Sequence, residues 1–492
     1  MTMDRKINRI LRCLYGLAVM MVLSHVQVVF ALSEEKEIEL GATEHSKIVA
    51  QYGVYRDKDL GKYITMVGER IARLSSRPDL EYHFTVLDSE EINAFALPGG
   101  FIYITRGLLT HMNSESELAA VLGHEIAHVT EKHAIKRANK GKAINVLNTV
   151  ASIVAHQQMG AVAASGLSGL GGMFGGVLLT GYSREFELEA DEVGARYMAL
   201  AGYNPEAMLK TIDILKAKDR IEIEHARKEK REPKVYHGFL STHPDHDTRY
   251  EQVIRESLNL MTDRQEYIRV DEFLEKLNGV FYGSTQQVGV VRNHNFYHPG
   301  LGIKLRFPDN WRLVPTRQRV QLVSQQSDAA ILIATGRMYK DATPEHYART
   351  LLSLNVRDGR NITIAGFPAF IGIADRLNSP YGPRPQRFAI IFENKRRIVY
   401  ELYGAGKHDL RNIANDRDFI ATIFSFDLMT KDDFRIALPT RLQVVRAEEG
   451  TTMEALAAES PITNYALEKL RVMNGFYPAG QPEPGQLIKI VN

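Results

Sequence analysis

The chain has 492 residues, of which 44% are hydrophobic and 24% charged, as in an ordinary globular protein of roughly two to four domains. Its 61 basic and 59 acidic residues nearly cancel, and residues 1–31 alone hold four basic side chains against one acidic. The remainder therefore has no basic excess with which to bind nucleic acid. The single cysteine, Cys13, excludes a disulfide within the chain.

The segment 1–31 has the features of a secretory signal peptide. Basic residues precede the apolar run Leu14–Leu23, and Val29 and Ala31 are small residues at the expected places before a cleavage site. We therefore expect an exported protein whose compartment is the bacterial periplasm. An uncleaved membrane anchor is the alternative, although polar residues follow the apolar run closely.

A short hairpin is predicted over 93–105. The segment Asn93, Ala94, Phe95 and Ala96 precedes a Pro-Gly-Gly turn, and a β-rich stretch follows. The first strand is either an exposed edge that pairs with an extended peptide substrate or an ordinary part of the core.

The next element is a helix that begins at 113–117 and is expected to continue to about Lys140. It contains His124-Glu125-Ile126-Ala127-His128. Two imidazoles four residues apart lie on one face of a helix, where both reach one metal ion, and the intervening carboxylate reaches the attacking water. The alternative is a core helix whose histidines only satisfy hydrogen bonds.

A glycine-rich, uncharged stretch follows at 161–180. It is either a lid or membrane-facing loop over a cleft, or a buried helical hairpin.

A second helix, beginning at Ser183, is rich in acidic residues. At about 100° per residue, Glu187 and Asp191 share one side with small and apolar residues, while Glu185, Glu189 and Glu192 form a solvated face. An inward acid pair is costly unless a cation compensates it. We therefore predict that Glu187 is a third metal ligand and that Asp191 orients a ligating histidine, unless the helix is merely acidic all round.

Two histidines and one glutamate leave the fourth position of a tetrahedral zinc ion open, which is typical of a catalytic site. Glu125 is then the general base that takes a proton from the attacking water and passes it to the leaving amine. We assign a catalytic role to Glu125. Asp191 contributes to catalysis through the ligating histidine that it orients.

Residues 34–260 resemble peptidase family M48, which includes CaaX-prenyl proteases, HtpX membrane proteases and BepA-like periplasmic enzymes. The motifs that carry the resemblance, in chain order, are Asn93–Gly100, His124–His128, Glu187–Asp191 and Thr242-His243-Pro244 with Arg249. The resemblance implies a mainly helical gluzincin-type domain with a small β-sheet and one Zn²⁺ per chain. It also implies the roles of His124, His128, Glu187, Glu125 and Asp191 given above.

His243 has two interpretations. By resemblance to BepA-like enzymes it caps the open position of the metal or contacts the transition state; alternatively it is a loop histidine held by Pro244 and nearby aspartates. Arg249 either pairs within this loop or meets the substrate carbonyl.

Two further domains are predicted after a linker at 263–294. Residues 295–437 contain strands near 302–307, 329–333, 361–364, 388–392 and 397–402, with helices near 344–354 and 409–422. The opening Phe307–Trp311 resembles PsbP-like α+β domains, so a scaffold or partner-binding role is expected there.

Residues 440–492 have a predicted βααβ order and resemble a LysM module. Thr451 replaces the usual aspartate of the first turn, so this module either attaches to peptidoglycan or is a structural appendage.

The predicted fold class is α+β multidomain, with the peptidase domain at 32–262. The predicted function is an exported zinc metalloendopeptidase that acts on unfolded or misassembled envelope proteins, with polypeptides, peptidoglycan and the membrane surface as expected partners. The alternative is a periplasmic chaperone, scaffold or cell-wall-binding protein with a latent protease core.

Overall fold

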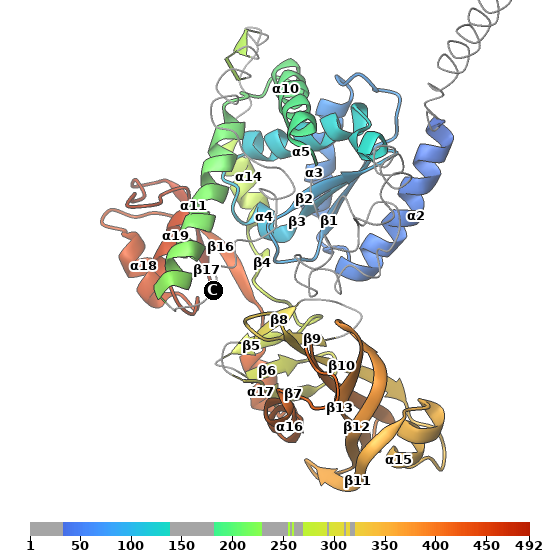
Figure 1. Cartoon of the computed structure of the whole chain (residues 1–492). Helices are drawn as coiled ribbons and strands as arrows, with labels where there is room; N and C mark the ends of the chain where they lie inside the picture. Colours follow the sequence, from blue (N-terminus) through green and yellow to red (C-terminus); the bar gives the residue numbers. More distant parts are fainter. Residues whose placement is uncertain are drawn as a thin grey trace, which may run out of the picture.

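The computed structural model describes residues 33–137, 182–228, 254–255, 258–259, 269–292, 295–308, 311–314 and 320–492. The predicted signal peptide, the glycine-rich stretch 161–180, His243 and Arg249 lie outside these residues. The described part is a mixture of helices and several sheets, as the predicted α+β class requires. Figure 1 shows one helical body with a small sheet and a second body built mainly of strands.

The helical body combines helices with a three-stranded sheet of order β1-β3-β2, in which β1 is parallel and β2 antiparallel to β3. Its elements are α2 (Glu34–Tyr52), α3 (Lys58–Ala72), β1 (His83–Leu87), β2 (Ala94–Leu97), β3 (Phe101–Thr105), α4 (Arg106–Leu109), α5 (Glu115–Thr130), α10 (Arg184–Leu200), α11 (Ala207–Lys228) and α14 (Val270–Leu277). β2 is an edge strand of this sheet, and all four of its residues are buried, so both interpretations of the hairpin stay open.

α5 is a core helix, because every one of its residues is buried. Ser114 caps it by accepting a hydrogen bond from the Glu117 amide, as the sequence predicts. The predicted continuation to Lys140 is wrong. The helix ends at Thr130, Lys132 adopts a left-handed φ of 54°, and a separate turn of helix begins at His133. No glycine or proline marks this end, so it could not be predicted from the usual stop signals of a helix.

The second body contains two antiparallel sheets, of order β11-β12-β13-β14-β10-β9-β8 and β15-β7-β6-β5. The strands are β5 (Val290–Arg292), β6 (Asn295–His298), β7 (Ile303–Arg306), β8 (Arg312–Val314), β9 (Val320–Val323), β10 (Ala329–Arg337), β11 (Val356–Ile364), β12 (Phe367–Ser379), β13 (Gly382–Glu393), β14 (Ile398–Gly406) and β15 (Asp427–Leu428). The five predicted strands are all present. A core that contains Phe296, Ile331 and Phe419 joins both sheets.

The two helices predicted in this body differ in detail. The first is α15 (Pro344–His346), which continues as a π-helical turn at Tyr347–Leu351. The second, α16 (Asp416–Phe424), begins seven residues later than the predicted 409. The reason is Asp409, whose carboxylate accepts hydrogen bonds from the amides of Gly406 and Ala414 and so closes a loop instead.

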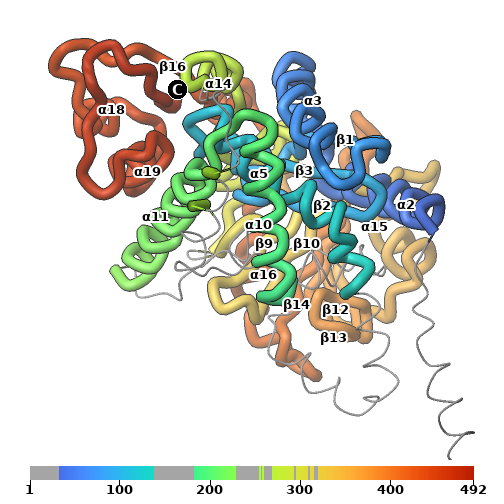
Figure 2. Tube along the Cα trace, turned by 90° about the horizontal axis from the view of Figure 1, so that it is seen from above, coloured from blue at the N-terminus to red at the C-terminus, as the bar shows by residue number. Residues whose placement is uncertain are grey.

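The C-terminal module has the predicted βααβ order, formed by β16 (Thr440–Arg446), α18 (Met453–Glu459), α19 (Ala466–Met473) and β17 (Leu487–Val491). Its resemblance to LysM stays a prediction. The module packs on the helical body: α19 lies beside α11 in both views (Figures 1 and 2). β16 also pairs with β4 (Phe281–Tyr282), so the predicted linker 263–294 contains α14 and β4.

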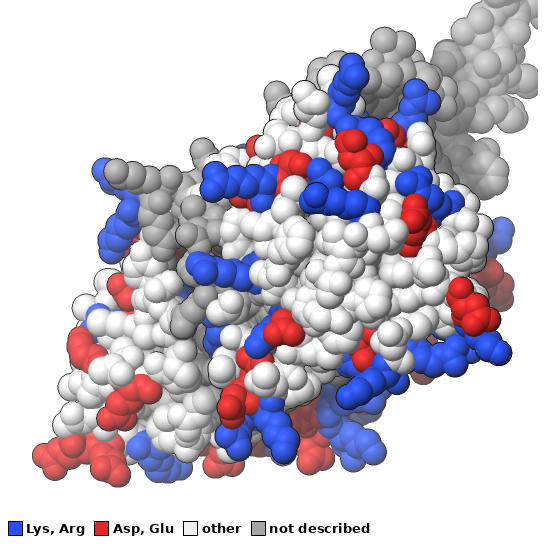
Figure 3. All heavy atoms as spheres, turned by 90° about the horizontal axis from the view of Figure 1, so that it is seen from below, with Lys and Arg blue, Asp and Glu red and all other residues white. Residues whose placement is uncertain are grey.

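Two surface properties bear on partners. On the face seen in Figure 3, basic and acidic side chains are interspersed, in keeping with their nearly equal numbers in the chain. Within the described residues, no helix combines the length and the apolar composition that crossing a bilayer requires.

Candidate metal centre

α5 and α10 pack closely because glycines meet where they cross. A Cβ built on Gly194 would lie 2.9 Å from both the carbonyl carbon of Gly123 and the amide nitrogen of His124. Only glycine allows the two backbones to come this near. The crossing therefore brings the acidic side chains of α10 against the HExxH motif of α5.

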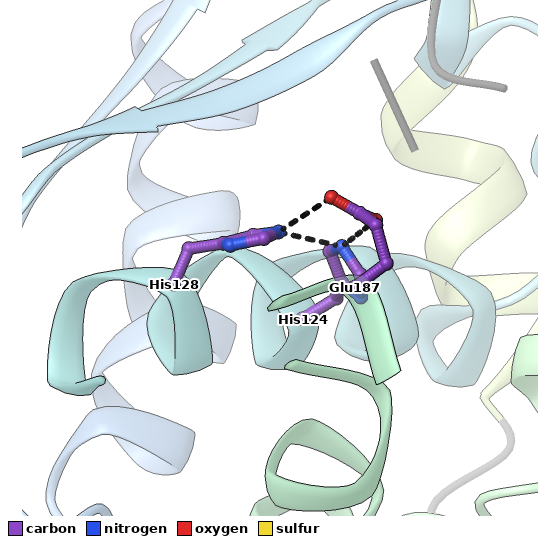
Figure 4. Close-up of side chains that lie close together, drawn as sticks. All are labelled: His124, His128 and Glu187. Carbon is purple, nitrogen blue, oxygen red and sulfur yellow. Dashed lines mark hydrogen bonds and ion pairs between the residues drawn. The ribbon is translucent and has the colours of Figure 1, made fainter. Parts of the chain in front are cut away.

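Three potential ligands converge at this crossing, as Figure 4 shows. The Nε2 atoms of His124 and His128 are 3.0 Å apart, and the Glu187 carboxylate oxygens lie 3.5 Å from each of them. All three side chains are buried. Zinc ligands at about 2.0–2.2 Å in a tetrahedron lie roughly 3.3–3.5 Å from one another. The two distances to Glu187 fall in this range and the distance between the histidines is somewhat shorter, so the three donors are compatible with a single zinc ion.

The electrostatics of the site also favour a cation. The Nδ1 atom of His124 lies 2.8 Å from an Asp191 carboxylate oxygen. Burial acts to lower the pKa of His124, but its hydrogen bonds and ion pairs with Asp191 and Glu187 outweigh this and hold the pKa well above its usual value. Two buried carboxylates thus require positive charge at this position, and a divalent ion supplies it while the imidazole stays neutral.

His128 is held by aromatic and polar neighbours that the sequence analysis missed. The Tyr182 ring stacks on it with a centroid distance of 4.1 Å, and its Nδ1 atom lies 2.8 Å from Nδ1 of His133. Burial lowers the pKa of His133 to about 4, so this ring is neutral at neutral pH. The sequence shows only that His133 follows His128 by five residues. In a helix that continued past Thr130, as predicted, this spacing would not have placed the two rings in contact.

Glu125 is completely buried beside His124 on α5. Burial, followed by the negative charges of Glu125 and Glu187, raises the pKa of Tyr182. Because Tyr182 stacks on His128, this places the Glu125 carboxylate in the same polar interior as the three potential ligands. Glu125 is not one of the three converging groups, as expected for a general base.

The predicted substrate strand lies next to this centre. Ala96 and Leu97 of β2 line a small cavity together with His128 and Tyr182. Ala94, Phe95 and Ala96 belong to the edge strand, and Asn93 directly precedes it. The arrangement brings the predicted strand and the predicted metal site together. His243 and Arg249 are outside the described residues.

Comparisons with known proteins point to the same region. Residues 59–257 match peptidase family M48. A beta-barrel assembly-enhancing protease of Escherichia coli is 27% identical over 219 residues, which cover 43% of this chain and 42% of the relative. The relative of the same name in Yersinia pestis is 29% identical over 179 residues, covering 36% and 37%.

The mitochondrial metalloendopeptidase OMA1 of Schizosaccharomyces pombe is 29% identical over 181 residues, covering 36% of this chain and 51% of the relative. The chain thus spans about half, or less, of the length of the curated relatives it matches. Among solved structures, the cyanobacterial PsbP of Synechocystis is 12% identical, with a TM-score of 0.22, and covers 30% of this chain and 98% of that one. The matched segment 59–257 contains the entire candidate metal centre, and the chain therefore carries a domain of peptidase family M48.

Proposed function

We propose that this chain is an exported zinc-dependent metalloendopeptidase that hydrolyses peptide bonds in unfolded or misassembled envelope proteins. The observation that carries the proposal is the convergence of His124, His128 and Glu187 at zinc-ligand spacing beside a buried Glu125. The relatives that are named proteases and metalloendopeptidases support it. The names that refer to β-barrel assembly support the choice of substrate class.

His124, His128 and Glu187 would hold the zinc ion. When bound, zinc polarises a peptide carbonyl and lowers the pKa of a coordinated water to about 7. Asp191 accepts the Nδ1–H of His124 and so leaves Nε2 free to be a ligand. Glu125 takes the proton of the attacking water and gives it to the leaving amine. Burial of all these groups strengthens each electrostatic contact.

Substrate binding is assigned to Asn93, Ala94, Phe95 and Ala96. An edge strand recognises an extended peptide through main-chain hydrogen bonds, which tolerate many side chains. This mode suits unfolded chains, because their backbone groups are unpaired. The position of β2 beside His128 supports the assignment. His243 and Arg249 remain proposed contacts to the metal or the substrate, on the strength of the sequence motif alone.

Export to the periplasm and contact with peptidoglycan are part of this proposal. The segment 1–31 supports export to the periplasm, and the βααβ module supports contact with peptidoglycan. The competing account, a chaperone or scaffold with a latent protease core, needs no reacting carboxylate at position 125.

Digestion of a casein-type unfolded substrate by the wild type and by Glu125→Gln separates these accounts. Removing the general base while keeping its size is expected to lower the rate by about 10²–10⁴-fold. Zinc content is expected to stay unchanged, since Glu125 is not a ligand. Glu192→Gln, an exposed change on α10, is the control and is expected to digest at the wild-type rate. Equal digestion by the wild type and Glu125→Gln would refute the proposed function.

A further inference from the structure

The Nδ1 atoms of both motif histidines, His124 and His128, are connected by hydrogen bonds to carboxylates of α10. Nδ1 of His124 meets Asp191 directly, at 2.8 Å. Nδ1 of His128 meets Nδ1 of His133 at 2.8 Å, and Nε2 of His133 meets a Glu189 carboxylate oxygen at 3.0 Å. Two carboxylates of α10, Asp191 and Glu189, are therefore connected to the two motif histidines. Asp191 contacts His124 directly, and Glu189 is connected to His128 through His133.

A metal ion on Nε2 of His128 would fix one order of donors and acceptors. Nε2 would then carry no proton, so the Nδ1–H of His128 would donate to Nδ1 of His133. His133 then carries its proton on Nε2 and donates it to Glu189. Every polar atom of the two rings has a defined role, which is the arrangement that orients metal-ligating histidines in proteins.

The local fold holds His133 in this place. The left-handed Lys132 turns the chain back at the end of α5, so that His133 faces His128 instead of following the helix axis. Its ring is completely buried and stacks on Phe186 of α10, with a centroid distance of 4.6 Å and an angle of 16°. Lys136 lies 3.6 Å from the Glu189 carboxylate, so it holds the end of this hydrogen-bonded series that lies farthest from His128.

We propose that His133 is a positioning residue for His128, and that Glu189 is its anchor. The pair fixes the tautomer and the ring orientation of the second motif histidine, as Asp191 does for the first. This inference deepens the proposed function, because it rests on His128 being a metal ligand. It assigns a role to Glu189, which the helical pattern had placed on a solvated face.

Zinc affinity, measured by chelator competition, tests the inference with two substitutions of His133. His133→Phe keeps a planar ring against Phe186 but removes the acceptor, and zinc binding is expected to weaken about 10–100-fold. His133→Asn places its Oδ1 at the position of Nδ1 and still accepts from His128, but it loses the contact with Glu189, so it is expected to weaken zinc binding clearly less than His133→Phe. The visible absorption of the Co²⁺-substituted protein is expected to change more in the first variant than in the second.

Two further variants guard against an effect of misfolding. Glu189→Ala alters a half-exposed side chain on the surface of α10, and it is expected to weaken zinc binding to a smaller extent than His133→Phe. His111→Phe removes a half-buried histidine, hydrogen-bonded to the Gly107 carbonyl, and is expected to leave zinc affinity unchanged. Circular dichroism of the zinc-free variants confirms that each is folded.

The inference is overturned if His133→Phe binds zinc as tightly as the wild type, or if His133→Asn is as weak as His133→Phe. The proposed function fails separately: loss of zinc affinity in His133→Phe without peptide cleavage by the wild type would support the positioning role and refute the protease. A wild type that binds no zinc would overturn both.

Discussion

His298, at the end of β6, is a residue whose burial makes the stability of the protein depend on pH. It is 8% exposed, and its Nδ1 atom accepts a hydrogen bond from the Leu301 amide at 3.2 Å. Burial lowers its pKa to about 4, whereas an unfolded histidine has a pKa of about 6.5. Between about pH 4 and pH 6.5, therefore, His298 is protonated in the unfolded state but neutral in the folded state. This contribution to stability is complete above about pH 6.5 and is lost as the pH falls towards 4.

We predict that His298→Asn reduces the acid sensitivity of the second body. Asparagine keeps an acceptor for the Leu301 amide but does not titrate. Urea unfolding at pH 7 and pH 4.5 is expected to show a loss of stability in the wild type that is smaller in the variant, by roughly 3 kcal/mol at most. Identical losses in the two proteins would show that His298 does not control this response.

At the scale of single residues, the sequence predicted those side chains of the candidate metal centre whose relative positions are set within a single helix. The spacing of His124 and His128, and the register that separates Glu187 and Asp191 from Glu185, both follow from helical geometry. His133 and Tyr182 could not be predicted in this way. His133 follows the left-handed Lys132 after the end of α5, and Tyr182 precedes the start of α10, so neither residue lies within the helical period that marks the ligands.

At the scale of elements, the crossing of α5 and α10 decides whether the ligands meet. Gly194→Ala is predicted to destabilise the protein by about 1–3 kcal/mol, because the new methyl group meets the backbone of Gly123 and His124, which cannot move aside as a side chain would. The separation of the helices is also expected to weaken zinc binding. Urea unfolding and chelator competition measure the two effects.

Gly61→Ala is the matched control for this substitution. Gly61 is also inside a helix, α3, but a Cβ built there meets nothing within 4 Å. Alanine is therefore expected to stabilise the protein by about 0.5–1 kcal/mol, with unchanged zinc affinity. If both glycines responded alike, close packing at the crossing would not be the cause.

Predicting elements from the sequence succeeded where a period or a cap was present and failed where a single side chain changed the backbone path. Ser114 and Ser183 marked the starts of α5 and α10. The early end of α5 and the loop closed by Asp409 depend on local conformations that no composition rule identifies. β12 was missed because glycine, proline and aspartate interrupt its apolar residues.

At the scale of the whole molecule, the C-terminal module is built into the helical body. Lys489 of β17 is completely buried and donates hydrogen bonds to the carbonyls of Thr110 and Met112, at 3.0 and 2.6 Å. Both carbonyls precede Ser114, the cap of α5. Leu470 and other apolar side chains of the module belong to the same core as that helix. The sequence predicted the elements of the module but not this docking, because the contacts join residues nearly 380 positions apart.

The central claim is that one zinc ion lies between α5 and α10, and the zinc content of the purified full-length protein and its variants tests it most directly. We predict about one zinc per chain in the wild type and a large loss in His124→Ala, His128→Ala and Glu187→Gln. Glu185→Gln, an exposed change on the same helix, is expected to keep the wild-type content. A wild type without zinc, or a Glu187→Gln variant that holds zinc as firmly as the wild type, would contradict the claim.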